Sequence, residues 1–197
     1  MKNLEETLAE YDYEFDPVLI ATEPSEPRDS AKLLVYRKET GEDFFDTFAN
    51  IGKYLPDGAV LVLNDTKVFP ARLHCKRKTG GRVEVFYVGI SRGDNCILAI
   101  TNHFLEVGEK VFLTDDIWFE CLGKEDKIYT LRPSFPIADV QKIFLQYGET
   151  PIPPYIKNTK LSETELREKY QTVFAKNTGS VAAPTASLHF TPELLEN

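Results

Sequence analysis

The sequence predicts an α/β fold in which a small antiparallel β-barrel is inserted into a discontinuous α/β domain. A continuous apolar run at 59–64 has the length of a strand and is typical of a strand covered on both faces. From Arg72 onward, short strand-like segments follow at fairly regular intervals, which favours a small barrel or sandwich. Helical periodicity returns after Pro136. We therefore expect the α/β domain at 1–69 and 149–197, and the barrel at 70–148.

The first third of the chain predicts short elements that are separated by turns. Leu4 and Leu8 share one helical face, and Asp16 followed by Pro17 is typical of a helix start. Pro56-Asp57-Gly58 stops a helical stretch before the apolar run. The expected elements are a short helix or frayed arm at 3–9, a turn at 16–20, strands at 32–37 and 43–45, a helix at 46–54 and a buried strand at 59–64.

The barrel block contains six segments with strand composition. Turn signals such as Gly80-Gly81 and Gly93-Asp94 separate most of them, and no long helix interrupts the block. The six segments are 72–77, 82–90, 95–101, 110–114, 117–122 and 127–132.

Three further helices are predicted after the barrel strands. The first has Val140, Ile143, Phe144 and Tyr147 on one face and ends at Gly148. After the rigid stretch PIPPYI at 151–156, Ser162 and Glu165 form a capping-box pattern that opens a helix towards Tyr170. Thr191 and Pro192 then predict an N-cap and a first helical position. Because the barrel and the α/β domain are joined on one side, we expect a cleft between them.

Composition limits the classes of protein to which the chain can belong. Its 197 residues are 42% hydrophobic and 27% charged, which is ordinary for a globular protein. The net charge of −8 weighs against nucleic-acid binding over the whole surface but leaves room for a local basic patch. The N-terminus lacks a secretory pattern and the longest apolar run is too short to span a bilayer, so we expect a cytoplasmic protein without a membrane partner. Cys75, Cys96 and Cys121 lack metal-ligand spacing and predict buried thiols and no metal.

Three segments carry candidate functional residues. Asn64, Asp65 and Thr66 follow the apolar run, where open α/β sheets bind ligands, although the same residues are typical of a simple Asx turn. If the site is real, Asp65 is the expected base or ribose-hydroxyl acceptor. A basic cluster beside the Gly80-Gly81 turn is suited to RNA phosphates, or else is a solvated hairpin. This cluster consists of Lys67, Arg72, Lys76, Arg77, Lys78 and Arg82.

The third segment is the C-terminal part with its aromatic residues and its last histidine. Tyr155 and Tyr170 have the chemistry to stack on a base, but tyrosines more often cap the edge of a core. His189 is either a general acid or base near neutral pH or a structural residue beside Phe190. The sequence lacks GxGxxG, Walker A, HExxH and GxSxG motifs, so nucleophilic serine or cysteine chemistry has no support.

Six segments, taken together and in order, resemble one family. From about Tyr11 to the last residue, the chain is similar to the S-adenosylmethionine:tRNA ribosyltransferase-isomerases, the QueA family. The segments are RDSAKLLVY (28–36), LVLNDTKVFPARL (61–73), KTGGRVEV (78–85), PIPPYI (151–156), YQTVFA (170–175) and GSVAAPTASLHFT (179–191).

The resemblance implies a fold, a reaction and a set of partners. The family fold is a Rossmann-like αβα domain with an inserted β-barrel. The family transfers the ribosyl part of S-adenosylmethionine to 7-aminomethyl-7-deazaguanine at the wobble position of tRNA with a GUN anticodon, and rearranges it to give epoxyqueuosine. S-adenosylmethionine is then a ribosyl-donor substrate and not a true cofactor. We expect a cytoplasmic monomer.

The resemblance also marks site residues. We expect Asp65 and His189 to be catalytic, and eleven further residues to bind substrates. Those eleven are Asn64, Thr66, Arg72, Lys78, Gly80, Gly81, Tyr155, Tyr170, Gln171, Thr185 and Thr191. One departure is Ser187, which stands where the family usually has glycine.

A second departure is length, because full-length members of the family continue well past this chain. We therefore expect the N-terminal part of the enzyme, with an incomplete αβα domain and little activity alone. The alternatives are a non-catalytic tRNA-binding fragment and one half of a split enzyme.

Overall fold

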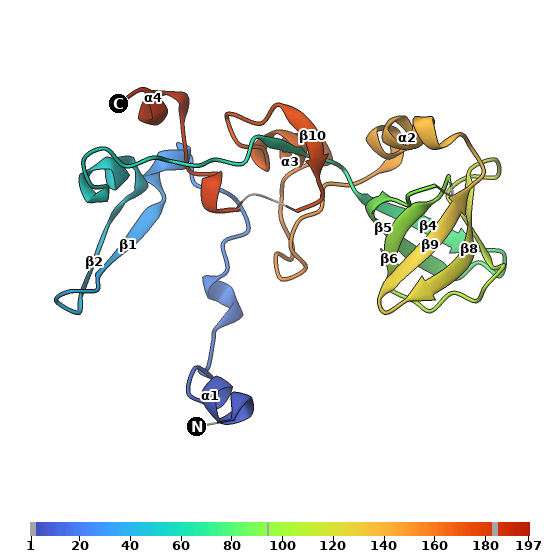
Figure 1. Ribbon diagram of the computed structural model, residues 1–197, viewed down its shortest axis with the longest axis horizontal. Coiled ribbons are helices and arrows are strands. Elements are labelled where there is room, and N and C mark those ends of the chain that lie inside the picture. Colours follow the sequence, from blue (N-terminus) through green and yellow to red (C-terminus); the bar gives the residue numbers. More distant parts are fainter. Residues whose placement is uncertain (1–2, 94, 183–184) are drawn as a thin grey trace.

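The computed structural model describes residues 3–93, 95–182 and 185–197. Figure 1 shows a β-barrel at one end, a β-hairpin at the other and a middle segment that joins them, while α1 (Leu4–Ala9) projects away from all three. Asp94, part of a predicted turn, and Ala183 and Pro184 of the C-terminal loop motif lie outside the described residues. None of the described helices is long and apolar enough to cross a membrane.

The predicted small antiparallel barrel is confirmed. Six strands close in the order β4-β5-β6-β9-β8-β7, and every neighbouring pair is antiparallel. Along β4, Leu73 and Cys75 point into the core while His74 and Lys76 are exposed, which is the alternation expected of a strand with one covered face. The strands are β4 (Arg72–Arg77), β5 (Arg82–Ile90), β6 (Ile97–Thr101), β7 (Lys110–Phe112), β8 (Trp118–Glu125) and β9 (Ile128–Pro133).

One helix closes an end of the barrel. The 3-10 turn η4 (Ile137–Asp139) leads into α2 (Val140–Tyr147), which ends at Gly148 as predicted. The buried ring of Phe144 lies 5.5 Å from that of Phe69 and 5.2 Å from that of Tyr87, between ring centres. These contacts join the helix to the barrel core, which includes Cys75 and Cys121. The side chains of all three cysteines are buried. Burial raises the pKa of the Cys75 thiol to about 12.

The middle segment is built around a short parallel pair. β3 (Thr66–Val68) pairs with β10 (Asn177–Ser180), and α3 (Glu163–Lys169) begins with the predicted capping box of Ser162 and Glu165. The prediction of a buried strand at 59–64 is wrong. Residues 59–64 lie outside any strand, and Val60 and Val62 are each 88% exposed. A strand buried on both faces needs a neighbour on each side and a covering layer on each face, whereas the described chain pairs β3 with β10 alone.

The far end consists of a hairpin and a small hydrophobic cluster. β1 (Lys32–Arg37) pairs with β2 (Glu42–Thr47), and a 3-10 helix, η3 (Phe48–Tyr54), follows directly. The helix predicted at 46–54 therefore begins two residues later, because Asp46 and Thr47 complete the ladder with β1. Phe48 and Phe190 are buried here and pack with Leu63 and Phe174. The remaining elements are η1 (Pro17–Leu19), η2 (Arg28–Ser30), η5 (Thr185–Ser187) and α4 (Pro192–Glu196).

The chain is thus a mixture of helices and strands that includes a closed barrel, as predicted. Outside the barrel, its described strands form two separate two-stranded sheets. The predicted domain boundaries at 69/70 and 148/149 stay a prediction; they place all six barrel strands and α2 in one unit.

Candidate functional site

The Arg28 side chain, at the start of the first family-like motif, ties three segments together. Its Nη1 donates to the carbonyl oxygen of Gln171 at 2.5 Å and to that of Leu188 at 3.4 Å. Its Nη2 donates to the carbonyl oxygen of Glu168 at 3.3 Å. The motifs at 28–36, 170–175 and 179–191, far apart in the sequence, therefore meet at one guanidinium group.

The Gln171 side chain brings a fourth motif to the same place. Its Oε1 accepts a hydrogen bond from the Val68 backbone nitrogen at 2.8 Å, and its Nε2 donates to the Val68 carbonyl oxygen at 2.9 Å. The amide of Gln171 thus satisfies the backbone of β3 in the way that a neighbouring strand would. This places Gln171, a predicted substrate-binding residue, in contact with the protein backbone.

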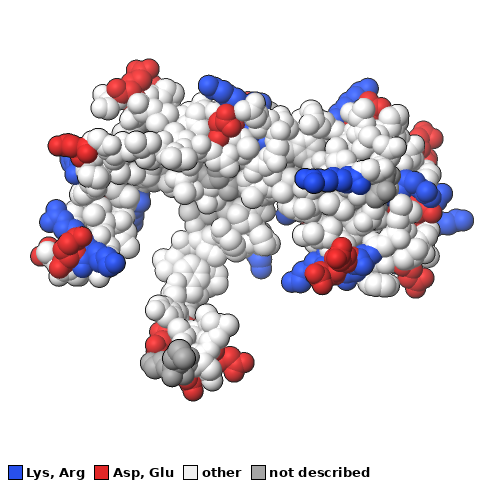
Figure 2. Space-filling view, in the orientation of Figure 1, with Lys and Arg blue, Asp and Glu red and all other residues white. Residues whose placement is uncertain are grey.

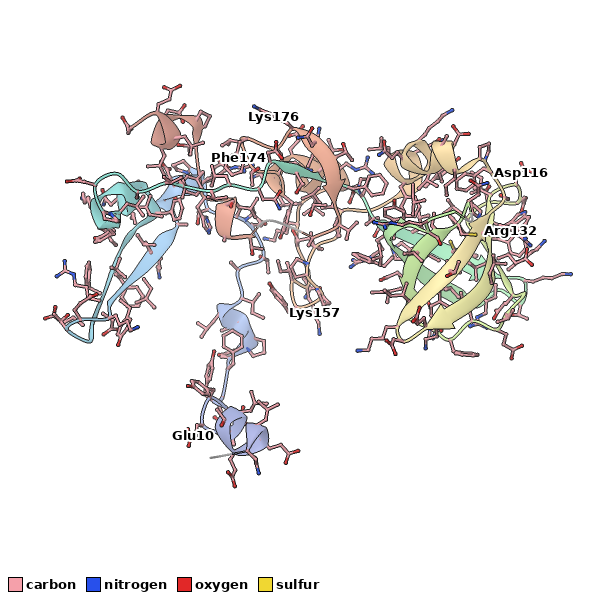
Figure 3. The ribbon with its side chains drawn as sticks, in the orientation of Figure 1. Glu10, Asp116, Arg132, Lys157, Phe174 and Lys176 are labelled. Carbon is pink, nitrogen blue, oxygen red and sulfur yellow. The ribbon has the colours of Figure 1, made fainter. Side chains whose placement is uncertain are left out.

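Asp65 lies directly before β3 and not beyond the end of a buried strand, because the strand at 59–64 is not formed. Its carbonyl oxygen accepts from the backbone nitrogens of Lys176 at 2.8 Å and Asn177 at 3.2 Å, and its Oδ2 accepts from Asn177 Nδ2 at 2.9 Å. Lys176 is labelled in the middle segment in Figure 3. Asn64 accepts from the Thr66 nitrogen at 2.9 Å, which is the Asx turn considered above.

The described residues of the loop motif at 179–191 pack against two clusters, one in the middle segment and one beside the hairpin. Leu188 is buried with Leu166 and Tyr170, and the His189 ring lies 5.3 Å from the Phe48 ring, between centres. The Thr191 hydroxyl oxygen accepts from the Leu194 nitrogen at 3.1 Å and caps α4, as predicted. Thr185 opens η5 and is exposed.

The two candidate tyrosines differ in accessibility. Tyr170 is buried in the cluster with Leu166 and Leu188, and this burial raises the pKa of its phenol. Tyr155, in the motif at 151–156, has 57% of its surface exposed. Tyr170 therefore has the position of a core residue, whereas the Tyr155 ring is accessible for stacking.

The candidate residues on the barrel divide into two groups. Arg72 begins β4, where its Nε lies 3.2 Å from Glu84 Oε1 and its Nη2 donates to the Ile152 carbonyl oxygen at 3.5 Å. Lys78, Gly80 and Gly81 form the turn at the other end of the strand, and Gly80 has a φ of 89°. Six residues of strand separate the two groups by roughly 20 Å.

A cavity of about 120 Å³ lies between the barrel and β10. It agrees with the expected cleft between the barrel and the α/β segment, but it is smaller than the roughly 300–1,000 Å³ of a typical small-molecule site. Its lining includes Phe69, Tyr87, Gly89, Gln141, Thr178 and Gly179.

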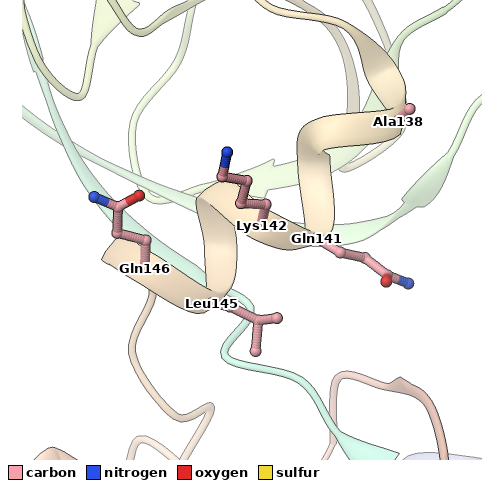
Figure 4. A pocket seen from close by; sticks show the side chains of 5 residues that line it. All are labelled: Ala138, Gln141, Lys142, Leu145 and Gln146. Carbon is pink, nitrogen blue, oxygen red and sulfur yellow. The ribbon is translucent and has the colours of Figure 1, made fainter.

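A larger hollow of about 550 Å³ follows the outer face of α2 (Figure 4). Its described lining is Ala138, Gln141, Lys142, Leu145 and Gln146, which includes no carboxylate or imidazole. Across residues 3–93, 95–182 and 185–197, no group of three or more His, Cys, Asp or Glu side chains is placed to hold a metal ion.

Sequence reasoning missed two residues that organise this region. Arg28 joins three motifs, and Asn177 holds the Asp65 carboxylate. The position of Arg28 at the start of a motif was a usable signal. Asn177 lies between two motifs and has no local pattern, so only its contact with Asp65 identifies it.

Comparisons with known proteins match almost the whole chain. The family model described as "Queuosine biosynthesis protein" matches residues 8–197. The S-adenosylmethionine:tRNA ribosyltransferase-isomerase of Thermotoga maritima is 44% identical over 191 residues, which cover 96% of this chain and 55% of that protein. The protein of the same name from Aquifex aeolicus is 41% identical over 191 residues, which cover 96% of this chain and 56% of that protein.

Solved structures also match this chain. One of them is the S-adenosylmethionine tRNA ribosyltransferase of Thermotoga maritima, with 27% sequence identity, a TM-score of 0.34, and coverage of 95% of this chain and 52% of that one. The chain spans about half the length of the curated relatives it matches.

Proposed function

Because this chain belongs to the queuosine biosynthesis protein family, we propose that it forms part of an S-adenosylmethionine:tRNA ribosyltransferase-isomerase. The family match over residues 8–197 is the observation that carries the proposal. The meeting of the motifs at 28–36, 61–73, 170–175 and 179–191 around β3 supports it.

In the proposed reaction, the complete enzyme transfers the ribosyl group of S-adenosylmethionine to 7-aminomethyl-7-deazaguanine at the wobble position of a tRNA. The product is epoxyqueuosine-tRNA, and adenine and methionine leave. S-adenosylmethionine acts as a donor substrate. The proposed partner is a tRNA with a GUN anticodon, and the proposed state is a cytoplasmic monomer.

We assign the base to Asp65. The sulfonium group of the donor acidifies the neighbouring ribose carbon, so a positioned carboxylate can remove a proton there before adenine is eliminated. Asp65 is exposed, and the bond from Asn177 holds its carboxylate through one of two oxygens. His189, which is half-buried beside Phe48, is the alternative base or the acid that assists the leaving adenine.

The remaining predicted residues take binding or positioning roles. Amide or hydroxyl groups for the ribose come from Asn64, Thr66, Thr185 and Thr191. In the helix cap the Thr191 hydroxyl oxygen only accepts a hydrogen bond, so its O–H can still donate to the ribose. Tyr155 offers an exposed ring to adenine or another base, whereas Tyr170 and Gln171 position the loop and β3. Arg72 orders the barrel junction, and Lys78, Gly80 and Gly81 contact tRNA phosphates.

The test of the function is adenine release from S-adenosylmethionine. We would join residues 1–197 to the part of the Thermotoga maritima relative that this chain does not match, in one polypeptide. We expect this chimera to release adenine only with tRNA that carries the precursor base. The 197 residues alone should release little or none. A folded chimera that releases no adenine would overturn the proposal, and release by the 197 residues alone would contradict the expected dependence on the rest of the protein.

Substitutions in the same chimera test the residue roles. Asp65→Asn keeps the shape and the Asn177 contact but removes the base, so adenine release should fall by roughly 10²- to 10⁴-fold. Asn177→Ala should cause a smaller loss, because it frees the carboxylate without removing it. Normal turnover by Asp65→Asn would move the assignment to His189, which His189→Ala then tests.

A second candidate, a tRNA-binding module without chemistry, is favoured by one observation. The exposed side chains of Lys76 and Lys78 line a groove on the barrel, and Asp65 is not among the residues that line it. Tight binding of precursor tRNA by a folded chimera that never releases adenine would support this candidate.

A further inference from the structure

A groove of about 910 Å³ runs over the outer face of the barrel where β4 and β7 meet. Lys76 on β4 lies directly opposite Phe112 on β7, and Phe112 lies opposite Trp118 on β8. Because strand side chains alternate between the two faces, these three side chains form one outward row. Lys78 and Lys110 also line the groove.

The groove is the basic part of an acidic chain. The barrel block at 70–148 has 11 Lys and Arg against 10 Asp and Glu, whereas the remaining residues have 12 against 21. Figure 2 shows Lys and Arg side chains spread over the barrel and interspersed with acidic ones. Two acidic residues line the groove, Glu109 and Asp115. The charge of Glu109 is offset by Arg77, whose Nη1 donates to its Oε1 at 2.7 Å. Lys76 and Lys78 are exposed, and among the described residues neither has an ion-pair partner.

Aromatic rings lie directly beside these cations. The half-buried Phe112 ring lines the groove next to Lys76, and Lys110 Nζ lies 3.8 Å above the centre of the Trp118 ring. An aromatic ring between flexible lysine side chains suits an unpaired nucleotide. Its base can stack on the ring while its phosphates bind the lysine ammonium groups. A duplex would offer phosphates but hide the faces of its bases, so Phe112 favours a single strand.

We propose that this groove binds an unpaired RNA segment, with one base stacked on Phe112 and phosphates held by Lys76 and Lys78. The proposal rests on the proposed tRNA-modifying function and adds a docking surface for the tRNA. The surface lies at the end of β4 that is remote from Arg72, so it holds RNA away from Asp65. The recognition is independent of base identity, because stacking and phosphate contacts carry no sequence information.

Direct binding tests the proposal with the chain as it stands. The probes are a labelled RNA stem-loop with a seven-nucleotide loop and a fully paired RNA of the same length. Trp118 is the only tryptophan of the chain, so quenching of its fluorescence reports occupancy close to the groove, and anisotropy gives the affinity. We expect the stem-loop to bind more tightly than the duplex and to quench Trp118.

Variants separate stacking from charge. Phe112→Leu should weaken stem-loop binding by roughly tenfold without changing its salt dependence, whereas Phe112→Tyr should retain binding. The double variant Lys76→Ala, Lys78→Ala should reduce the slope of log affinity against log salt by about 1.4, at about 0.7 for each phosphate contact. Lys127→Ala, an exposed lysine on the β8–β9 turn, is the matched control and should change nothing.

Unchanged affinity in Phe112→Leu or in the lysine double variant overturns the proposal, as does equal binding of the duplex. Complete displacement of the stem-loop by polyglutamate at matched ionic strength, with Phe112→Leu binding normally, would identify the groove as a general anion site. Adenine release by the chimera is measured separately. If the chimera releases adenine but the groove variants bind RNA normally, the groove assignment is wrong and the proposed function stands.

Discussion

The side chain of Asp46 illustrates how single residues are set by their immediate partners. Its carboxylate accepts hydrogen bonds from the Tyr54 hydroxyl, from Asn50 Nδ2 at 2.7 Å and from the Thr47 nitrogen at 2.7 Å. These bonds favour the charged form and lower the carboxyl pKa from 3.8 to about 2, with Tyr54 as the largest cause. The same bond raises the pKa of the Tyr54 phenol. The group ties the end of β2 to η3.

Titration of Asp46 is the first prediction. Its folded pKa lies below the unfolded value, so its stabilising effect is complete above about pH 3.8 and is lost as the pH falls towards 2. We expect the carboxyl signal in a ¹³C NMR titration to have its midpoint near 2. In Tyr54→Phe the midpoint should rise towards 3.8, and an unshifted midpoint in that variant would contradict the assigned cause.

The side-chain amide of Gln171 gives the second prediction. Gln171→Ala leaves the buried backbone groups of Val68 without their partners, so the free energy of unfolding should fall by roughly 1–3 kcal/mol. Gln171→Glu should cost at least as much at pH 7, because a carboxylate then faces the Val68 carbonyl oxygen. Urea denaturation measures both. Gln146→Ala on the exposed face of α2 is the control, with an expected change within about 0.5 kcal/mol.

At the scale of elements, the joint between α2 and the middle segment depends on one glycine. A Cβ atom at Gly148 would overlap the carbonyl oxygens of Pro70 and Phe144. The sequence indicates this glycine only as a helix end, and its backbone has an ordinary extended conformation. The requirement is therefore for space, which the last turn of α2 and the chain around Pro70 restrict together.

Gly148→Ala is the third prediction. The backbone must shift to admit the methyl group, so the free energy of unfolding should fall by about 1–3 kcal/mol or more. Gly123→Ala is the control, because a Cβ there meets nothing within 4 Å. Thermal denaturation of the two variants gives the comparison. Equal melting temperatures of the two variants would contradict the prediction, because they would mean that the backbone admits the methyl group without loss of stability.

At the scale of the whole molecule, the middle segment exposes apolar surface. Val60 and Val62 are almost fully exposed, and Leu61 lines a hollow of about 390 Å³ with Phe190, Leu194 and others. Figure 2 shows few charged side chains between the barrel and the hairpin. A contiguous exposed apolar surface is typical of a protein interaction site or an aggregation-prone region.

The fourth prediction uses this exposure. Val60→Thr combined with Val62→Thr should change the free energy of unfolding by less than about 0.5 kcal/mol and should reduce binding of the dye ANS. Leu63→Ala is the matched comparison, because Leu63 packs in the cluster of Phe48 and Phe190, and its loss should cost about 1 kcal/mol or more. A loss above about 1 kcal/mol in the valine double variant would mean that this segment is covered in solution.

The elements that the sequence determined by itself are those with local signals. The barrel strands, the capping box of Ser162 and Glu165, and the caps at Thr191 and Gly148 depend on neighbours in the chain, and the structure confirms them. The order of six motifs likewise identified the family, which the comparisons confirm.

Tertiary structure alone decided which distant groups meet. Val68 and Gln171 are 103 residues apart and no local pattern pairs them, and the same holds for Arg28 and Leu188. The apolar run at 59–64 had the right composition for a strand but lacks the neighbours that a doubly covered strand needs. β3 forms further along, and Asp65 directly precedes it. One basic cluster in the sequence is divided into two groups in the structure, because an extended strand separates Arg72 from Lys78.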